Sequence, residues 1–347
     1  MANKDIVVIG GSAGSHAVLR QIVSDLPADL PASVFIATHV PAGGPTLLPE
    51  VLSHTSKMRV VAAIDGAPIE RGCIYVAVPD HHMLVIDGTI RLGDGPRENM
   101  TRPAIDPLFR SAALSYGSRT VGVVLSGLLN DGASGLGAVK ACGGTALVQH
   151  PLDAHADQMP LAALETVDVD EVAGASDLGK ILARIVHQSA EDERACPESL
   201  PLEVQIAAGG RVGADVILSM ATPAALTCPD CAGVLSEVRG EQPLRYRCQI
   251  GHAVTAEVLE SRADDVHEAL TVALRIMEER VTLVTRMADD ARRTHRSTVA
   301  ELYEARSEEY GRYAEVLREA AVASLRDRRP NHEEGGGSSV SPAEPLG

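Results

Sequence analysis

The sequence predicts an α/β fold: a doubly wound, mainly parallel, Rossmann-like sheet, followed by a small module and C-terminal amphipathic helices. Over residues 4 to about 190, short runs rich in β-branched residues alternate with helical patterns. Several of these runs are apolar throughout, as is typical of parallel strands buried on both faces. Farther along, a cluster of Cys and His residues precedes a long stretch almost free of Gly and Pro.

Each element of the sheet domain is predicted from its local pattern. Helical periodicity indicates helices at 14–25, 105–116, 134–141, 159–166 and 177–187. An Asp-Gly pair at 87–88 predicts a hairpin between two short runs. The runs that predict strands are Ile6–Gly10, Val34–Thr38, Val60–Ile64, Ile74–Val78, Met83–Ile86, Val121–Leu125 and Ala146–Val148.

Changes of composition divide the chain into five segments. Within residues 255–328, apolar residues recur at spacings of three and four from Leu259 to Ala288, which predicts a long amphipathic helix. A polar break near 292–298 separates this helix from a second one. These helices are expected to form a hairpin or an oligomer contact. The five segments are an α/β domain at 1–190, a charged linker at 191–200, a Cys/His module at 201–254, helices at 255–328 and a disordered tail at 329–347.

Composition excludes several classes of protein. The net charge is −16, and aromatic residues are only 2% with no Trp, so nucleic acid is not an expected partner. No apolar run reaches the roughly 18 residues of a membrane span, and the N-terminus lacks the apolar region of a signal peptide. We therefore expect a reduced, cytoplasmic protein without membrane insertion. Cys73 and Cys142 are expected to be small core residues, and Cys196 lies in the linker.

Three potentially catalytic residues follow three predicted strands. Ser12 lies in the turn Gly10-Gly11-Ser12-Ala13-Gly14, between a strand and a helix N-terminus that offers free N–H groups. His39 ends the second strand, and Asp131 follows a later one. Ligands bind outside the carboxyl ends of parallel strands, so a nucleophile, a base and a carboxylate are expected at one edge of the sheet.

Two other classes of function compete with a hydrolase. A Gly-rich turn after a first strand is most often a nucleotide-binding loop, but the second Gly of G-x-G-x-x-G is replaced by Ser12, and no P-loop motif is present. A catalytically idle signalling scaffold is the other alternative. Intact Ser12, His39 and Asp131 argue against it.

Five sequence blocks resemble the chemotaxis protein-glutamate methylesterases, the CheB family. The resemblance spans roughly residues 5–186 and implies that Ser12 is the nucleophile, His39 the base and Asp131 the orienting acid of a serine hydrolase. It implies hydrolysis of glutamate γ-methyl esters on a chemoreceptor or a related signalling protein, with possible deamidation of glutamine and no catalytic cofactor. The blocks are Ile9-Gly10-Gly11-Ser12-Ala13-Gly14, Thr38-His39-Val40-Pro41, Arg102-Pro103-Ala104-Ile105-Asp106-Pro107-Leu108-Phe109, Leu125-Ser126-Gly127-Leu128-Leu129-Asn130-Asp131-Gly132 and Gln158-Met159-Pro160.

The chain departs from the family pattern in two ways. Leu128 stands where the family commonly has Met, yet its backbone N–H can still join that of Ala13 in stabilising an oxyanion. Many members begin with a receiver domain, whereas this chain begins at the first catalytic strand. Arg102 is either a contact for an acidic substrate loop or an ordinary surface arginine.

The module at 201–254 carries a metal-ligand pattern. Cys228 and Cys231 form a CxxC pair, and Cys248 and His252 follow. Three thiolates and one imidazole are typical of a closed, structural zinc site, and a redox CxxC would leave the last two residues unexplained. We therefore expect a zinc-binding module that is separable from the chemistry, so that a chain ending near residue 190 retains activity.

Overall fold

The computed structural model describes residues 2–41, 43–44, 47–191, 194–210, 213–240, 242–261 and 263–326. The expected disordered tail at 329–347 lies outside these residues. The chain divides into two compact units, Met1–Leu259 and Glu260–Gly347, and each is described by itself.

A seven-stranded sheet forms the centre of the first unit, and every pairing in it is parallel. The order β3-β4-β2-β1-β7-β8-β9 reverses direction between β1 and β7, which confirms the doubly wound prediction. Sequence analysis missed β9, a short and half-exposed Glu-Val-Ala segment. The strands are β1 (Ile6–Gly11), β2 (Ser33–Thr38), β3 (Arg59–Ala62), β4 (Cys73–Val76), β7 (Thr120–Val124), β8 (Thr145–Gln149) and β9 (Glu171–Ala173).

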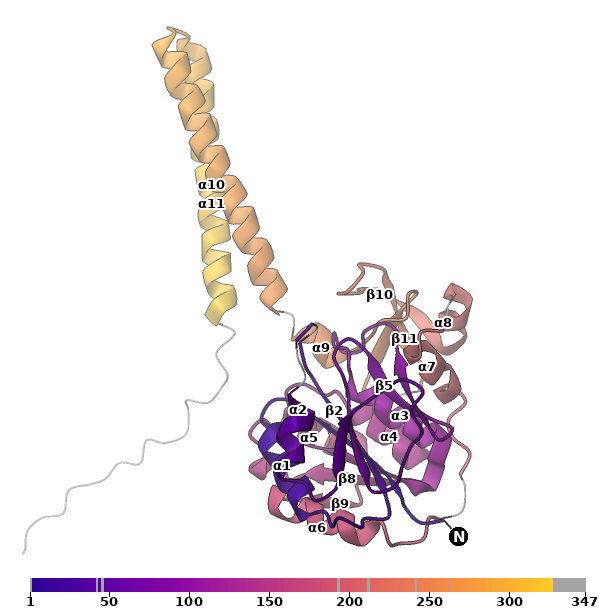
Figure 1. Cartoon of the computed structure of the whole chain (residues 1–347). Helices are drawn as coiled ribbons and strands as arrows, with labels where there is room; N and C mark the ends of the chain where they lie inside the picture. Colours follow the sequence, from indigo (N-terminus) through magenta and orange to yellow (C-terminus); the bar gives the residue numbers. More distant parts are fainter. Residues whose placement is uncertain are drawn as a thin grey trace, which may run out of the picture. The chain divides into compact units, whose positions relative to one another are not determined.

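Helices cover both faces of this sheet (Figure 1). Alternate residues of a strand point to opposite faces of the sheet and belong to two separate cores. Val7 and Ile9 pack on the face covered by α1, α2 and α6, whereas Ile6 and Val8 pack on the face covered by α3, α4 and α5. The β5–β6 hairpin adds to the second core. These elements are α1 (Ser15–Asp25), α2 (Leu48–Ser53), β5 (His82–Ile86), β6 (Thr89–Gly93), α3 (Ile105–Tyr116), α4 (Ala133–Ala141), α5 (Gln158–Thr166), α6 (Ala175–Ile185) and the 3₁₀ turns Gly117–Arg119 and Pro151–Asp153.

Residues 200–259 pack against the sheet domain instead of standing apart. They form two helices, a four-stranded antiparallel sheet in the order β10-β11-β12-β13, and a short final helix. The expected separation at the linker 191–200 is therefore not seen, because the first compact unit runs through Leu259. The elements are α7 (Leu200–Ala207), α8 (Ala214–Met220), β10 (Ala221–Thr227), β11 (Val234–Val238), β12 (Arg245–Cys248), β13 (Ala253–Thr255) and α9 (Ala256–Glu260).

Five buried charges hold this second part on α3. Glu98 and Arg110 of the sheet domain meet Glu203, Arg245 and Arg247, and none of the five side chains is more than 3% exposed. Arg247 Nη2 lies 2.7 Å from Glu98 Oε1, and Arg245 Nη2 lies 3.0 Å from Glu203 Oε1, while Arg110 pairs with both glutamates. Burial opposes ionisation of Glu98, but Arg110 and Arg247 lower the pKa of its carboxyl. Removing one of the five side chains would leave a buried charge without its partner.

Two cysteines depart from the expected reduced state. Cys142, at the end of α4, forms a disulfide with Cys196 of the predicted linker. The sequence could not indicate this pairing, because 54 residues separate the two. Cys73 is a buried free thiol, as expected of a small core residue.

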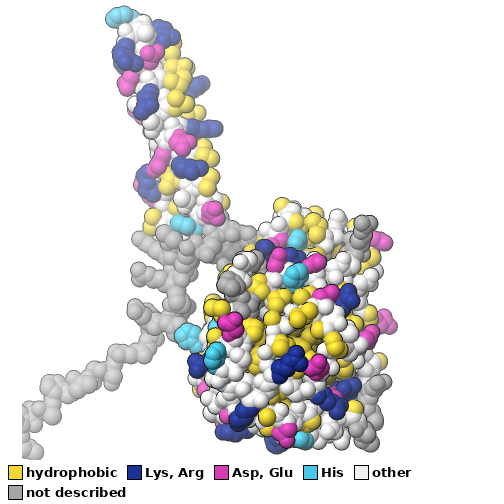
Figure 2. Space-filling view, in the orientation of Figure 1, with side chains coloured by type: hydrophobic (Ala, Val, Ile, Leu, Met, Phe, Trp, Pro, Cys, Tyr) yellow, Lys and Arg dark blue, Asp and Glu magenta, His cyan; other side chains and the backbone are white. Residues whose placement is uncertain are grey.

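The second unit contains a helical hairpin of α10 (Ala263–Arg293) and α11 (Ser297–Arg326). Arg292 pairs with Glu304 at 2.7 Å across the hairpin, and small buried residues such as Ala291 and Ala300 let the helices approach closely. Figure 2 shows apolar side chains along the length of the hairpin. Val266 and Leu283 of α10 are more than half exposed. Among the described helices, none has the length and apolar character needed to cross a membrane.

Candidate active site

Ser12 lies in the tight turn between β1 and α1. Gly14, the residue that precedes α1, has φ 79°, which favours glycine. A Cβ on Gly10 would lie 2.2 Å from Ile105 Cγ2, so glycine there allows the start of α3 to pack over the end of β1. The turn thus brings Ser12 and the N-terminus of α3 to the same edge of the sheet.

The three residues predicted from strand ends lie in one hydrogen-bonded line. His39 Nδ1 lies 3.0 Å from Ser12 Oγ, and His39 Nε2 lies 2.7 Å from Asp131 Oδ2. The residues follow β1, β2 and β7, and the sheet reverses its winding between β1 and β7. With Nε2 donating to the carboxylate, Nδ1 is left as an acceptor facing the hydroxyl.

Asp131 is buried and held by several donors. The backbone N–H of Ile105 donates to its Oδ2 at 2.7 Å, and Asp106 N–H and Asn99 Nδ2 donate to its Oδ1 at 3.2 and 3.1 Å. The carboxylate therefore sits at the N-terminus of α3, where the helix dipole favours an anion. Burial opposes its ionisation, but the hydrogen bonds and charge of His39, with the other donors, hold the pKa of Asp131 at about 2. Asp131 is thus an anion throughout the physiological range.

A second buried carboxylate, Asp106, was not singled out by sequence analysis. It lies in the first turn of α3, and its Oδ1 accepts the N–H groups of Gly132 and Gly135 at 3.0 and 2.7 Å. The loop before α4 thus places the Asp131 carboxylate at the N-terminus of α3, while α3 places the Asp106 carboxyl group at the N-terminus of α4. Burial, followed by the charge of Asp131, raises the pKa of Asp106 to about 7.

The loop after β7 presents a free backbone donor beside the serine. Gly127 N–H donates to Ala156 O at 3.0 Å, and Leu129 N–H donates to Gln158 Oε1 at 2.7 Å. Between them, Leu128 N–H has no partner among the described residues, and neither has Ala13 N–H in the turn of Ser12. Ser12 N–H donates to Ser126 O at 2.9 Å, which holds the two loops together. Two N–H groups are therefore available to an oxyanion.

A cavity of about 420 Å³ opens beside His39. Arg102 lines it, but its Nη2 donates to Asp80 at 2.8 Å and its Nη1 to the carbonyl of Gly95 at 2.9 Å. The hydrogen bond from Arg102 to Asp80 lowers the pKa of Asp80. Arg102 therefore lines the cavity as a paired charge. The lining residues are His39, Val40, Pro41, Asp80, Arg97, Met100, Thr101 and Arg102.

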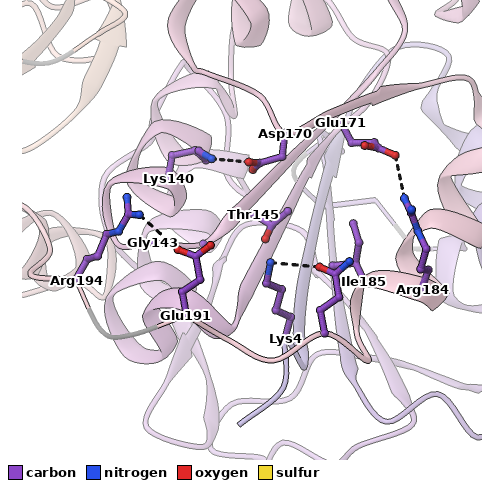
Figure 3. A pocket seen from close by; sticks show the side chains of 12 residues that line it. Lys4, Lys140, Gly143, Thr145, Asp170, Glu171, Arg184, Ile185, Glu191 and Arg194 are labelled. Carbon is purple, nitrogen blue, oxygen red and sulfur yellow. Dashed lines mark hydrogen bonds and ion pairs between the residues drawn. The ribbon is translucent and has the colours of Figure 1, made fainter. Parts of the chain in front are cut away.

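A second cavity, of about 330 Å³, lies at the opposite end of the strands, where Lys4 precedes β1 and Thr145 begins β8 (Figure 3). Its charged side chains pair mostly with one another. Lys140 lies 2.7 Å from Asp170, as the dashed line shows. The carboxyl edge is therefore the better site for chemistry.

The predicted metal ligands also converge. Potential donor atoms of Cys228, Cys231, Cys248 and His252 all lie within 4.8 Å of one another. Cys231 Sγ–Cys248 Sγ is 3.6 Å, and His252 Nδ1 lies 3.8 Å from Cys228 Sγ and 3.4 Å from Cys248 Sγ. A tetrahedral zinc ion with Zn–S about 2.3 Å and Zn–N about 2.0 Å requires separations of about 3.8 and 3.5 Å. The three separations lie close to those values, and every other pair of donor atoms lies within 4.8 Å.

Comparisons with known proteins agree on one family. Residues 7–182 match the family described as CheB methylesterase. A putative protein-glutamate methylesterase/protein-glutamine glutaminase of Leptospira interrogans is 33% identical over 190 residues, which cover 54% of this chain and 98% of that protein. The protein-glutamate methylesterase/protein-glutamine glutaminase 2 of Anaeromyxobacter dehalogenans is 34% identical over 184 residues, which cover 53% of this chain and 54% of that protein.

A solved structure agrees with this result. The CheB methylesterase catalytic domain of Thermotoga maritima matches with a TM-score of 0.51 and 32% identity. The match covers 54% of this chain and 100% of that domain. The chain therefore belongs to the CheB methylesterase family.

Proposed function

We propose that this protein is a protein-glutamate methylesterase that uses Ser12, His39 and Asp131. The observation that carries the proposal is the continuous line from Ser12 Oγ through His39 to Asp131, with distances of 3.0 and 2.7 Å, at the point where the sheet reverses. Membership of the family supports the reaction class. The substrates are glutamate γ-methyl esters on a chemoreceptor or a related signalling protein.

The geometry suits acyl transfer. His39 Nδ1 takes the proton of Ser12 Oγ as the oxygen attacks the ester carbonyl carbon, and Asp131 stabilises the imidazolium that forms. The N–H groups of Ala13 and Leu128 bind the oxyanion. His39 then gives the proton to the departing methoxide, so methanol leaves and an acyl-enzyme remains. Water, deprotonated by His39, attacks this ester; the bond to Ser12 Oγ breaks, His39 returns the proton to Ser12 Oγ, and the substrate protein leaves with a free glutamate carboxylate.

The same two steps convert glutamine to glutamate, because ammonia can leave in place of methanol. The printed names of the Leptospira and Anaeromyxobacter relatives include both activities. We assign the protein segment that carries the ester to the cavity beside His39, where Met100 contributes an exposed apolar side chain.

We also propose that Cys228, Cys231, Cys248 and His252 bind one structural zinc ion. Four protein ligands complete a tetrahedral shell and leave no position for an activated water. Burial raises the pKa of Cys228 to about 12, so this thiol needs a cation beside it to become a ligand thiolate. Burial also lowers the pKa of His252, which favours the neutral imidazole that a metal requires.

Methanol release from methylated receptor membranes tests the function. The wild-type protein should release methanol, and Ser12→Ala should not. A fluorophosphonate should label the wild type at Ser12 and leave Ser12→Ala unlabelled. An unlabelled wild type that releases no methanol would favour the idle scaffold.

A further inference from the structure

We propose that the module of residues 200–259 positions the catalytic aspartate, so that its metal site supports the esterase without touching the substrate. This inference rests on the proposed function. It assigns positioning roles to Asn99, Asn130 and Thr255.

The first connection runs through the backbone next to a metal ligand. Ala253 directly follows His252 and begins β13. Its N–H donates to Arg97 O at 3.2 Å, and its carbonyl accepts the N–H of Asn99 at 2.8 Å. Asn99 Nδ2 in turn donates to Asp131 Oδ1 at 3.1 Å. Two successive hydrogen bonds therefore join the residue after a metal ligand to the carboxylate of the triad.

Residues 98–101 form a tight turn whose conformation depends on the hydrogen bonds from Ala253. Asn99 and Met100 have φ values of 49° and 63°, and Glu98 and Thr101 exchange backbone hydrogen bonds across them. A two-residue turn with both φ values positive suits Asn but strains Met. The bonds from Ala253 help to hold Asn99 in this conformation.

The second connection reaches the residue beside Asp131. Thr255 Oγ1, which is fully buried, donates to Asn130 Oδ1 at 2.8 Å. Asn130 Nδ2 donates to Glu257 Oε2 at 2.6 Å. Both polar ends of the Asn130 side chain are thus held by the module, and this fixes the backbone from which Asp131 projects.

The third connection is electrostatic. Arg247 precedes the ligand Cys248 and pairs with Glu98, the neighbour of Asn99. At the other end of the ligand set, Asp230 lies between Cys228 and Cys231, and its Oδ1 is 3.8 Å from Arg97 Nη1. The first and third connections therefore reach the loop 97–99 from residues beside the metal ligands, and the second reaches Asn130 from Thr255 and Glu257, which follow the ligand His252 in sequence.

The small size of the module explains why a metal matters here. Its core around the ligands has six buried members, two of which are ligand cysteines: Cys228, Leu235, Tyr246, Cys248, Val254 and Val258. Such a core has little apolar area to order it without the ion. Loss of zinc should therefore loosen the turn between β12 and β13 and release Asn99 and Asn130.

The test compares two buried threonines. Thr255→Val removes the hydroxyl that donates to Asn130 Oδ1 and that accepts Val258 N–H at 3.3 Å. The control is Thr120→Val, because Thr120 is also fully buried and its Oγ1 also donates one hydrogen bond, to Ala112 O at 3.1 Å, remote from Asp131. We expect Thr255→Val to lower kcat about fivefold, the size of one typical hydrogen bond, with KM within about twofold. Thr120→Val should leave both values unchanged.

A second readout does not depend on turnover. The proton between His39 Nε2 and Asp131 should give a low-field NMR resonance that broadens or shifts in Thr255→Val and in the zinc-depleted protein, and returns when zinc is added back. If Thr255→Val does not fold, Glu257→Ala takes its place, with the exposed Glu237→Ala in the same module as its control.

The outcomes separate the two proposals. A wild-type protein without esterase activity would overturn the proposed function. An active wild type in which Thr255→Val matches Thr120→Val in kcat and in the resonance would overturn the positioning role alone. Zinc depletion that leaves kcat and the resonance unchanged would also overturn that role.

Discussion

Two adjacent buried aspartates should respond in opposite ways to the same substitution. Asp131 accepts two hydrogen bonds at each oxygen: from Ile105 and His39 at Oδ2, and from Asp106 and Asn99 at Oδ1. In Asp131→Asn, an amide nitrogen in the place of Oδ1 faces the donors of Asp106 and Asn99. In the place of Oδ2 it faces Ile105 N–H and His39, whose neutral ring can switch tautomer and accept. Losing one or two hydrogen bonds to a charged group at about 1.5–3 kcal/mol each lowers the free energy of unfolding by about 1.5–6 kcal/mol. Ester hydrolysis should fall on the order of 10⁴-fold.

Asp106→Asn keeps the important contacts. Its Oδ1 can still accept the N–H groups of Gly132 and Gly135, and only the long 3.4 Å bond from Asn99 to Oδ2 is lost. The pKa of Asp106 is raised from 3.8 to about 7 in the folded protein. Between these values the unfolded state loses its proton first, so this carboxyl lowers wild-type stability as the pH rises. One unit of pKa difference corresponds to about 1.4 kcal/mol, so the loss in the free energy of unfolding reaches at most about 4 kcal/mol above pH 7.

Urea unfolding at pH 5 and pH 8 measures both effects. Asp131→Asn should be less stable than wild type at both values. The free energy of unfolding of Asp106→Asn, relative to that of wild type, should rise by up to about 3 kcal/mol between pH 5 and pH 8, because the variant has no carboxyl to ionise at this position. Asp106→Asn should also retain most of the hydrolytic activity. The reasoning is refuted if Asp106→Asn destabilises the protein as much as Asp131→Asn, or if its difference from wild type does not change with pH.

Three further outcomes are expected. Ser12→Ala should lower kcat on the order of 10⁶-fold with a nearly unchanged thermal melt, because it removes the nucleophile from a unit that acts together; retained turnover of the purified variant would exclude Ser12. Metal analysis should find one zinc per chain, and Cys248→Ser should lower that occupancy, whereas Cys73→Ser, at a buried thiol outside the cluster, should not; equal zinc content in both variants would contradict the site. A chain truncated after residue 190 should melt lower and hydrolyse a small activated ester poorly, because Glu98 and Arg110 lose buried partners and Asn99 loses Ala253; full activity would restore the separable module that the sequence suggested.

The sheet domain could be predicted because its physics is local. Runs such as Val34–Thr38 are almost wholly apolar, so the local sequence predicts both the strand and its burial on both faces. The three residues at the strand ends follow from the topology rule for parallel sheets. Their catalytic roles stay predictions, and the hydrogen bonds between them are what the geometry adds.

The docking of the module could not be predicted, because its interface is charged. In sequence, Glu203, Arg245 and Arg247 resemble surface residues, yet each lies in the interior beside an opposite charge. Only tertiary structure distinguishes a buried pair from a solvated one. Asn99 and Asp106 were missed for a related reason: a polar loop and a helix start give no sign that both face the same carboxylate.

The buried charges also bear on how the chain is made. The seven-stranded sheet ends at Ala173, so a ribosome releases all of it before Arg245 and Arg247 have been synthesised, and domains generally fold as they emerge. During that interval Glu98 and Arg110 remain hydrated. The growing chain therefore exposes a charged surface at this place, whereas a hydrophobic surface would promote aggregation. The later segment then closes over them and withdraws the charges from water. The order of synthesis thus leaves the support around Asp131 as the last part of the first unit to be completed.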